Sequence, residues 1–175
     1  MKVDIVKKAA SFAKERHKHQ KRKTGEPYFI HPKNVARTVS NWTKDKNVIA
    51  AGYLHDVIED TGADYEDIEE RFGKKVADYV SLMSRDMRLP KNKSLSLFRR
   101  QLGSAPPEVK LIAAADMENN ASSIADTDFM KSWFNKINTM MPYLKRGNMG
   151  RYKKGILSLL SRVEKAEDKF LSNLR

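Results

Sequence analysis

Apolar residues recur at spacings of three and four along most of the chain, which is the pattern of amphipathic helices. In the first segment Val3, Val6, Ala9 and Ala13 share one side, and lysines occupy the other. Helices are predicted over residues 2–18, 32–42, 47–59, 64–71, 74–84, 107–124, 127–145 and 149–172, with a basic loop over 88–96 that leads into a further short helix. No segment alternates apolar and polar residues as a strand does. The sequence therefore predicts an all-α fold, a bundle of about eight to ten helices.

The composition narrows the class of protein. With 175 residues, of which 40% are hydrophobic, the chain is long enough and apolar enough for one globular domain. It contains no Cys, which excludes a disulfide framework, a cysteine-based zinc finger and thiol catalysis. No apolar run has the length of a membrane span, and the N-terminal residues lack the apolar stretch of a signal peptide. We therefore expect a cytoplasmic protein with no membrane partner.

The charge distribution favours anionic ligands. Lys and Arg number 34 against 22 Asp and Glu, a net charge of +12, and the basic residues gather at both ends of the chain. A basic protein attracts nucleic acids, nucleotides and anionic surfaces. No aromatic-interleaved patch or recognition motif accompanies the charge, so nucleic acid binding rests on charge alone and is not expected.

The stretch YLHDVIEDTG, residues 53–62, places polar side chains in an otherwise apolar helix. On a helix His55, Asp56 and Glu59 share a face, because they are three and four residues apart. Carboxylates in an apolar setting need a cation or hydrogen bonds, and imidazole with carboxylate suits Mn or Fe. The alternative is an exposed acidic helix end, which the helix dipole disfavours.

Two further segments offer ligands of the same kind. His31 precedes Pro32 at a helix entry, where a lone His is usually structural. Asp116 follows three alanines, and Asn120 and Ser123 lie on the same helical face. A surface Asp on a helix of small residues is the alternative interpretation.

The order of a His, a His-Asp doublet and a distant Asp is the pattern of the HD superfamily of metal-dependent phosphohydrolases. The segment HQKRKTGEPYFIHPKNVA (19–36) closely resembles the start of the hydrolase domain of the RelA/SpoT family, and LHDVIEDTGADYEDIEERFGKKVADYV (54–80) resembles its second block. RLPKNKSLSLFRRQL is similar to a loop of the small, Mesh1-like alarmone hydrolases. The resemblance covers about residues 5–125 and implies a single HD-type hydrolase domain over 1–175, with C-terminal helices over 126–175.

The resemblance also implies an activity: removal of pyrophosphate from the 3′ position of guanosine tetra- and pentaphosphate, with manganese as cofactor. The implied metal ligands are His31, His55, Asp56 and Asp116. Glu59 and Asp60 are expected to position or activate the attacking water. The implied substrate contacts are Arg22 on the base, Lys23 beside the nucleotide, Asn120 and Ser123 on the nucleoside side, and Lys91 at the phosphates.

Two departures from the family pattern bear on the substrate. Met117 and Met87 stand where the family has basic residues, and Arg85, Arg88 and Lys93 are candidates to replace them. This favours, as an alternative, a phosphatase acting on another nucleotide, such as the dinucleotide cofactor NADPH. A second alternative is a nucleotide-binding regulator that has lost turnover. Further along, Trp133, Phe134, Ile137, Met141 and Leu144 are predicted to form an ordinary core stripe.

Overall fold

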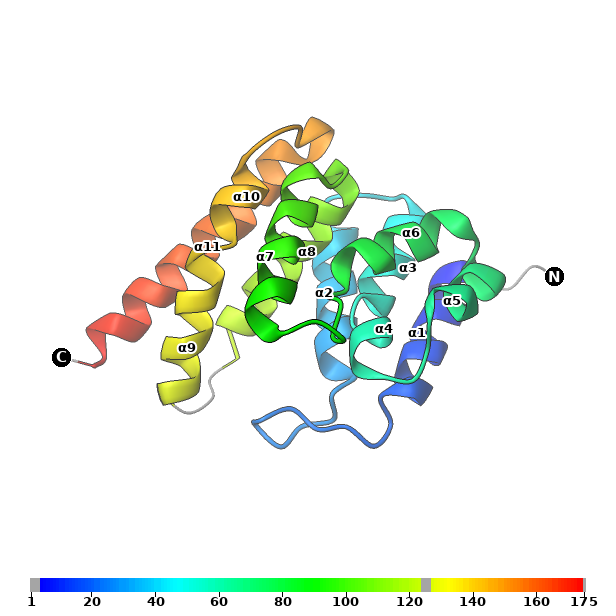
Figure 1. Ribbon diagram of the computed structural model, residues 1–175, viewed down its shortest axis with the longest axis horizontal. Helices are drawn as coiled ribbons and strands as arrows, with labels where there is room; N and C mark the ends of the chain where they lie inside the picture. The colour runs from blue at the N-terminus through cyan, green and yellow to red at the C-terminus, as the bar shows by residue number, and fades with distance from the viewer. Residues whose placement is uncertain (1–3, 124–126, 175) are drawn as a thin grey trace.

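The protein is all-α, as the sequence predicts (Figure 1). A computed structural model describes residues 4–123 and 127–174. Within these ranges there is no β-strand, and nine α-helices have eight residues or more. The helical segments are α1 (Ile5–Arg16), α2 (Ile30–Ser40), α3 (Lys46–Leu54), α4 (Val57–Asp60), α5 (Tyr65–Phe72), α6 (Lys74–Met83), α7 (Lys91–Ser104), α8 (Pro107–Ala121), α9 (Thr127–Asn138), α10 (Met141–Lys145), the 3₁₀ turn η1 (Gly150–Tyr152) and α11 (Lys153–Ser172). None of the described helices combines the length and the apolar character needed to span a membrane.

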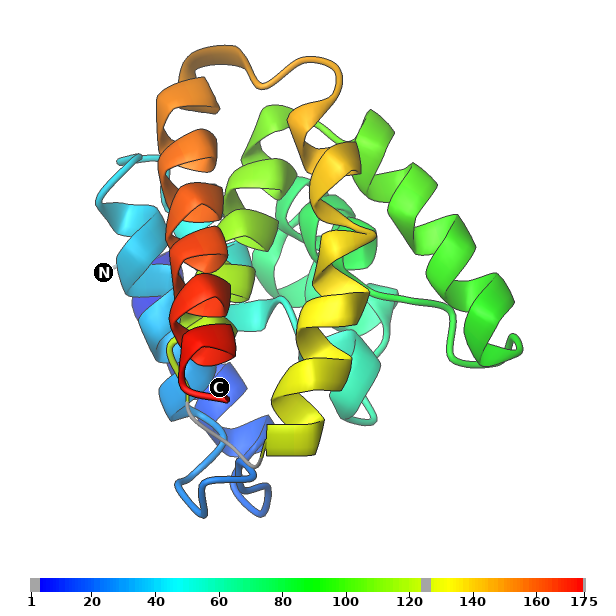
Figure 2. The same cartoon turned by 90° about the vertical axis from the view of Figure 1, so that its left-hand side faces the viewer.

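Helix α8 is the centre of the bundle. It packs against α2 and α3 on one side and against α11 on another, and Figures 1 and 2 show it enclosed between them. Its middle residues Ala113, Ala114 and Ala115 are buried. Alanine lets neighbouring backbones approach closely and leaves little room to fill. A buried central helix of this kind can present a polar side chain to several neighbours at once.

Helices α2 and α3 also meet through small residues. A Cβ atom on Gly52 of α3 would lie only 3.2 Å from the Cα atom of Ala36 on α2. This close contact brings together the two segments that carry His31, at the start of α2, and His55, just after α3. The spacing between the two histidines is therefore set by backbone packing.

The predicted helix over 47–59 is interrupted. Helix α3 ends at Leu54 with His55 as its C-cap residue, and α4 starts at Val57 after Asp56. The apolar spacing continues through both segments, since Leu54 and Val57 are both buried, and for this reason the sequence does not reveal the break. His55 and Asp56 consequently lie in a turn between two helices.

Two other segments differ from the sequence prediction. The basic loop predicted over 88–96 is helical from Lys91 onward, because Ser94, Phe98 and Leu102 bury one face of α7. The helix predicted over 127–145 is divided into α9 and α10. Residues 2 and 3 of the first predicted helix, and residue 124 at the end of the one over 107–124, lie outside the described residues.

Gly155, in the first turn of α11, packs directly on Trp42, and its replacement tests this contact. A Cβ atom on Gly155 would lie 2.7 Å from Cδ2 and 2.8 Å from Cε3 of the Trp42 ring. At a solvent-exposed position inside a helix, replacing Gly by Ala stabilises the folded protein by about 1 kcal/mol. Here we expect Gly155→Ala to lower the free energy of unfolding by about 1–3 kcal/mol, as overpacking does.

The measurement is the urea concentration at which half of the protein is unfolded. A shift of this midpoint, with an unchanged dependence of the unfolding free energy on urea, reports the change in stability. Lys154→Ala, at the exposed neighbouring position, is the control and should change stability by less than about 0.5 kcal/mol. A Gly155→Ala protein as stable as the parent would mean that the Trp42 ring moves aside without cost.

Candidate metal centre and adjacent pocket

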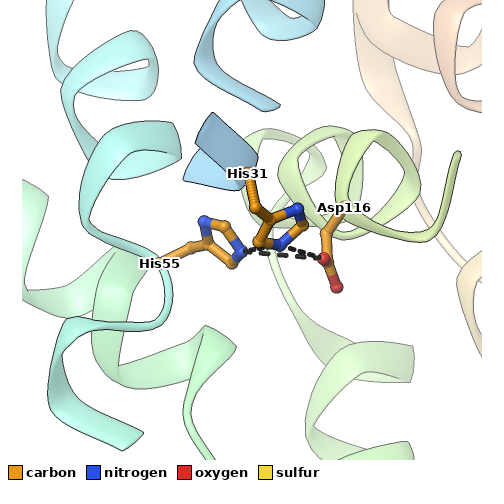
Figure 3. A group of neighbouring side chains, drawn as sticks. All are labelled: His31, His55 and Asp116. Carbon is orange, nitrogen blue, oxygen red and sulfur yellow. Dashed lines mark hydrogen bonds and ion pairs between the residues drawn. The ribbon is translucent and has the colours of Figure 1, made fainter. Parts of the chain in front are cut away.

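Four side chains from three parts of the fold converge at one point. His31 comes from α2, His55 and Asp56 from the turn between α3 and α4, and Asp116 from α8. His31 Nε2 lies 3.0 Å from Asp116 Oδ1 and 3.4 Å from Asp56 Oδ2. His55 Nε2 lies 3.1 Å from Asp56 Oδ2 and 3.6 Å from Asp116 Oδ1. Figure 3 shows His31, His55 and Asp116 pointing toward one another, and we call the four residues the ligand cluster.

Both imidazole rings are fixed by hydrogen bonds on their far side. His31 Nδ1 donates to Asn119 Oδ1 at 2.7 Å, and His55 Nδ1 donates to the carbonyl oxygen of Gly52 at 2.9 Å. A proton held on Nδ1 leaves Nε2 as the free lone pair in the neutral ring. The two Nε2 atoms face each other at 3.3 Å, and the rings are 2% and 1% exposed. Metal-binding histidines are oriented in this way.

The ligand cluster needs positive charge at its centre. Burial lowers the pKa of each histidine, but the facing Asp116 and Asp56 outweigh it and raise the pKa of His31, and that of His55 further. Burial opposes ionisation of Asp56 and Asp116, yet the imidazoles hold the pKa of both carboxyl groups below its usual range. A divalent cation bound between two nitrogens and two carboxylate oxygens would supply the same charge and displace the protons. The residues present therefore fit a divalent metal ion.

The two carboxylates of the cluster also have hydrogen-bond partners, which contact the same oxygen atoms that face the histidines. The Tyr28 hydroxyl lies 2.8 Å from Asp56 Oδ2 and 2.9 Å from Asp60 Oδ2, and so bridges these two acids. Asn120 Nδ2 donates to Asp116 Oδ1 at 2.7 Å. Burial and the nearby acids raise the pKa of Tyr28, so the phenol keeps its proton and acts as a donor. Every member of the ligand cluster is thus held by a second residue.

A cavity of about 270 Å³ opens beside His31, and we call it the Arg22 pocket. Its lining includes Lys21, Arg22, Lys23, Thr24, Tyr28, His31, Asn120, Ser123, Phe129 and Trp133. Arg22 Nη2 donates to Asn120 Oδ1 at 2.9 Å, which fixes the guanidinium plane. The Lys23 ammonium lies 3.9 Å from the centre of the Phe129 ring. Flat aromatic surfaces and fixed cations together suit a ligand with a ring system and negative charge.

The structure brings most of the predicted site residues together. Arg22, Lys23, Asn120 and Ser123 line the Arg22 pocket, as expected for substrate contacts. Lys91 is exposed at the start of α7 and is not among the residues lining this pocket.

The two methionines that replace expected basic residues occupy opposite environments. Met117 is only 2% exposed and packs in the core, whereas Met87 is 61% exposed. Of the basic residues proposed to replace them, Arg88 pairs with Asp86 at the surface and Lys93 is exposed. Arg85 alone of the three contacts a carboxylate of the HDVIED segment, that of Glu59.

Several residues of the site were not identified from the sequence. Asn119 orients His31, although in the sequence it is only one of two adjacent asparagines. Trp133, assigned to the core stripe, is half-buried and lines the Arg22 pocket, while Phe134 and Ile137 are buried as predicted. Lys136 lies on the same face of α9, three residues after Trp133. No local pattern distinguishes such positions, because the neighbouring segments are distant in sequence.

The chain belongs to the HD domain family, whose model matches residues 9–128. It is 38% identical over 125 residues to a guanosine-3′,5′-bis(diphosphate) 3′-pyrophosphohydrolase of Aquifex aeolicus (strain VF5), which covers 70% of this chain and 18% of that protein. It is also 38% identical over 116 residues to the enzyme of the same name, MESH1, of Xenopus tropicalis, which covers 64% of this chain and 65% of that protein. The chain thus spans less than two thirds of the length of either relative.

A solved structure supports the same fold assignment. The structure described as a metazoan ortholog of SpoT that hydrolyzes ppGpp superposes with a TM-score of 0.77 and 25% identity, over 93% of this chain and 97% of that chain. The resemblance to the RelA/SpoT hydrolase domain that the sequence motifs indicate is therefore confirmed, as is the helical HD fold.

Replacing Asp56 tests the ligand assignment. We expect Asp56→Ala to abolish stoichiometric metal binding, because it removes the oxygen that lies 3.1 Å from His55 Nε2. The metal content of the dialysed protein, measured after loading with Mn²⁺, gives the answer. Asp168→Ala, at an exposed position on α11, removes the same charge and should retain the metal. One ion per chain in Asp56→Ala would contradict the assignment.

Replacing Asn119 tests the orienting hydrogen bond to His31. Asn119→Leu keeps the size of the side chain but removes the acceptor of the His31 Nδ1 proton. Loss of such a partner weakens metal binding by about 10- to 100-fold. Calorimetric titration with Mn²⁺ measures the change, and Asn92→Leu, at an exposed position of α7, is the control. Equal affinities in the two variants would mean that packing alone orients the ring.

Proposed function

We propose that this protein removes the 3′ diphosphate from guanosine tetra- or pentaphosphate and releases GDP or GTP and pyrophosphate. The observation that carries the proposal is that the ligand cluster adjoins the Arg22 pocket, since His31 belongs to both. A purine nucleotide in that pocket would place a phosphate group beside the cluster. Relatives with 38% identity are named as hydrolases of this substrate. We treat residues 1–175 as one hydrolase unit, and its cytoplasmic location stays a prediction.

His31, His55, Asp56 and Asp116 would hold the metal ion, and we propose Mn²⁺ because imidazole and carboxylate together suit it. When bound, such an ion lowers the pKa of a water molecule and polarises a phosphoryl oxygen. The protein itself orients the four ligands through hydrogen bonds to Asn119, the Gly52 carbonyl group, Tyr28 and Asn120. Binding of the ion would displace the protons that the raised pKa of each histidine favours.

Asp60 is our candidate for the group that takes the proton from water. In the reaction the water oxygen bonds to phosphorus, the bond from phosphorus to the ribose 3′ oxygen breaks, and that oxygen gains a proton. Partial burial and the neighbouring Asp56 raise the pKa of Asp60, which brings this carboxyl group closer to the range useful for a general base. Above that pKa Asp60 is a carboxylate, with Tyr28 directing one of its oxygens.

The nucleotide would be held by the predicted substrate residues. The guanidinium plane of Arg22, fixed by Asn120, suits stacking on a purine base. Lys23 lies beside it in the same pocket, and Ser123 donates its hydroxyl proton to the Asn119 carbonyl oxygen at 2.9 Å, which leaves the hydroxyl oxygen as an acceptor. A role for Lys91 at the phosphates stays a prediction from the family resemblance.

The test is product analysis. We expect the purified protein, incubated with Mn²⁺ and guanosine tetraphosphate, to give equal amounts of GDP and pyrophosphate on anion-exchange chromatography. Asp60→Asn should bind the nucleotide but turn it over at least about 100-fold more slowly, because it cannot accept a proton.

Release of orthophosphate from guanosine tetraphosphate would contradict the proposal. So would full occupancy by metal without turnover of guanosine tetraphosphate. The same assay with NADPH then distinguishes a phosphatase for another nucleotide from a regulator without turnover.

A further inference from the structure

Glu59 is turned toward Arg85 and is held there by several hydrogen bonds. Its Oε2 atom accepts the backbone N–H of Arg85 at 2.9 Å, and Oε1 accepts Arg85 Nε at 3.0 Å. The Nη2 atom of Arg85 also donates to Oε1. Both side chains are largely buried, with 16% and 19% exposed. Glu59 therefore joins α4 to the loop after α6 through a bidentate ion pair with an additional backbone contact.

A carboxylate held in this way is badly placed to accept a proton from water. Both of its oxygens already accept hydrogen bonds from a permanently charged guanidinium or from its backbone. To bind a proton, Glu59 would have to give up part of that pairing. Asp60, the next residue, has the Tyr28 hydroxyl as its side-chain partner within the described part of the chain. The two adjacent acids thus have different surroundings and should have different tasks.

Arg85 still has donor capacity after this pairing. Its Nη1 atom makes no hydrogen bond to any described residue. Of the three basic residues that are candidates to replace the expected cations, Arg85 is the one bound to the segment that carries His55 and Asp56. The guanidinium fork recognises phosphate oxygens as well as carboxylates.

A second cation, Lys136, lies on the helix face that carries Phe129 and Trp133 of the Arg22 pocket. Burial lowers the pKa of Lys136, and repulsion from Arg85 adds to this, while Asp116, Glu59 and Asp56 act in the opposite direction. Lys136 makes no ion pair within the described residues. An unpaired and partly desolvated cation on this face of α9 favours an anionic ligand beside it.

We propose that Arg85 is a substrate-binding residue for the phosphoryl oxygens of the departing diphosphate, and that Glu59 is a positioning residue that holds Arg85 in place. This inference rests on the proposed function. The family pattern has basic residues at the positions of Met87 and Met117. The proposal gives Arg85 the role of neutralising the phosphate charge in their place. It also assigns the proton transfer to Asp60 alone.

A double-mutant cycle tests the proposal. Glu59→Gln and Arg85→Met should each lower kcat/KM for guanosine tetraphosphate by about 100-fold, the usual effect of removing one donor from a charged transition state. The double variant should be no slower than Arg85→Met alone, because Glu59 acts through Arg85. Arg88→Met removes the same charge from an exposed position of the same loop and should leave kcat/KM unchanged.

The pH profile separates positioning from proton transfer. The pH dependence of kcat/KM should be the same in Glu59→Gln as in the parent protein, because Asp60 is intact. A different pH dependence in Glu59→Gln, additive effects in the double variant, or a normal rate for Arg85→Met would each overturn the proposal. A purely structural role for the pair would lower thermal stability without making the double variant equal to Arg85→Met in rate.

A binding measurement keeps this test independent of the proposed function. Inorganic pyrophosphate is titrated calorimetrically into the Mn²⁺-loaded parent protein, Arg85→Met, Glu59→Gln and Arg88→Met. Equal weakening in Arg85→Met and Glu59→Gln, with no change in Arg88→Met, supports the inference even where guanosine tetraphosphate is not turned over. Unchanged affinity in Arg85→Met overturns it even where the parent enzyme is active.

Discussion

Two imidazole nitrogens and two carboxylate oxygens are forced close together in a buried part of this protein, and much of the structure serves to hold them there. Acceptors at such distances repel one another unless protons or a cation lie among them. Each member has a further hydrogen-bond partner: Asn119 for His31, the Gly52 carbonyl for His55, Tyr28 for Asp56 and Asn120 for Asp116. The partners fix the direction of the lone pairs, so the site is organised before any ion binds.

The helix packing explains how the partners reach these positions. The contact of Gly52 with Ala36 sets how near α3 lies to α2, and the same Gly52 provides the carbonyl group that orients His55. On α8, a run of buried alanines lets neighbouring helices approach, and Asp116 follows that run directly. The small residues therefore have two effects. They shorten the distances between the helices, and they leave room for the polar side chains of the ligand cluster.

The all-α fold could be predicted from the sequence because it depends on local helical spacing. The set of His31, His55, Asp56 and Asp116 came from the family resemblance, and the structure places these side chains together, while their role as metal ligands stays a prediction. The interruption of the helix at His55 could not be predicted, since Leu54 and Val57 keep the apolar spacing through the break. The helical start of α7 was hidden by its basic residues, and only burial of Phe98 and Leu102 explains it. Partners such as Asn119 and Arg85 act on residues 88 and 26 positions away, and no local pattern encodes such a contact.

Glu59 and Asp60 show how far a shared motif determines chemistry. The two acids are adjacent in sequence, and both follow the His-Asp doublet. In the folded chain Arg85 and its backbone engage Glu59, while Tyr28 links Asp60 to Asp56, a proposed metal ligand. A carboxylate paired with a guanidinium is suited to holding charge in place. A carboxylate that shares a hydroxyl group with the proposed metal centre is suited to moving a proton. The division follows from both partners: Arg85 restrains Glu59 alone, and the Tyr28 hydroxyl contacts Asp60 alone of the two acids.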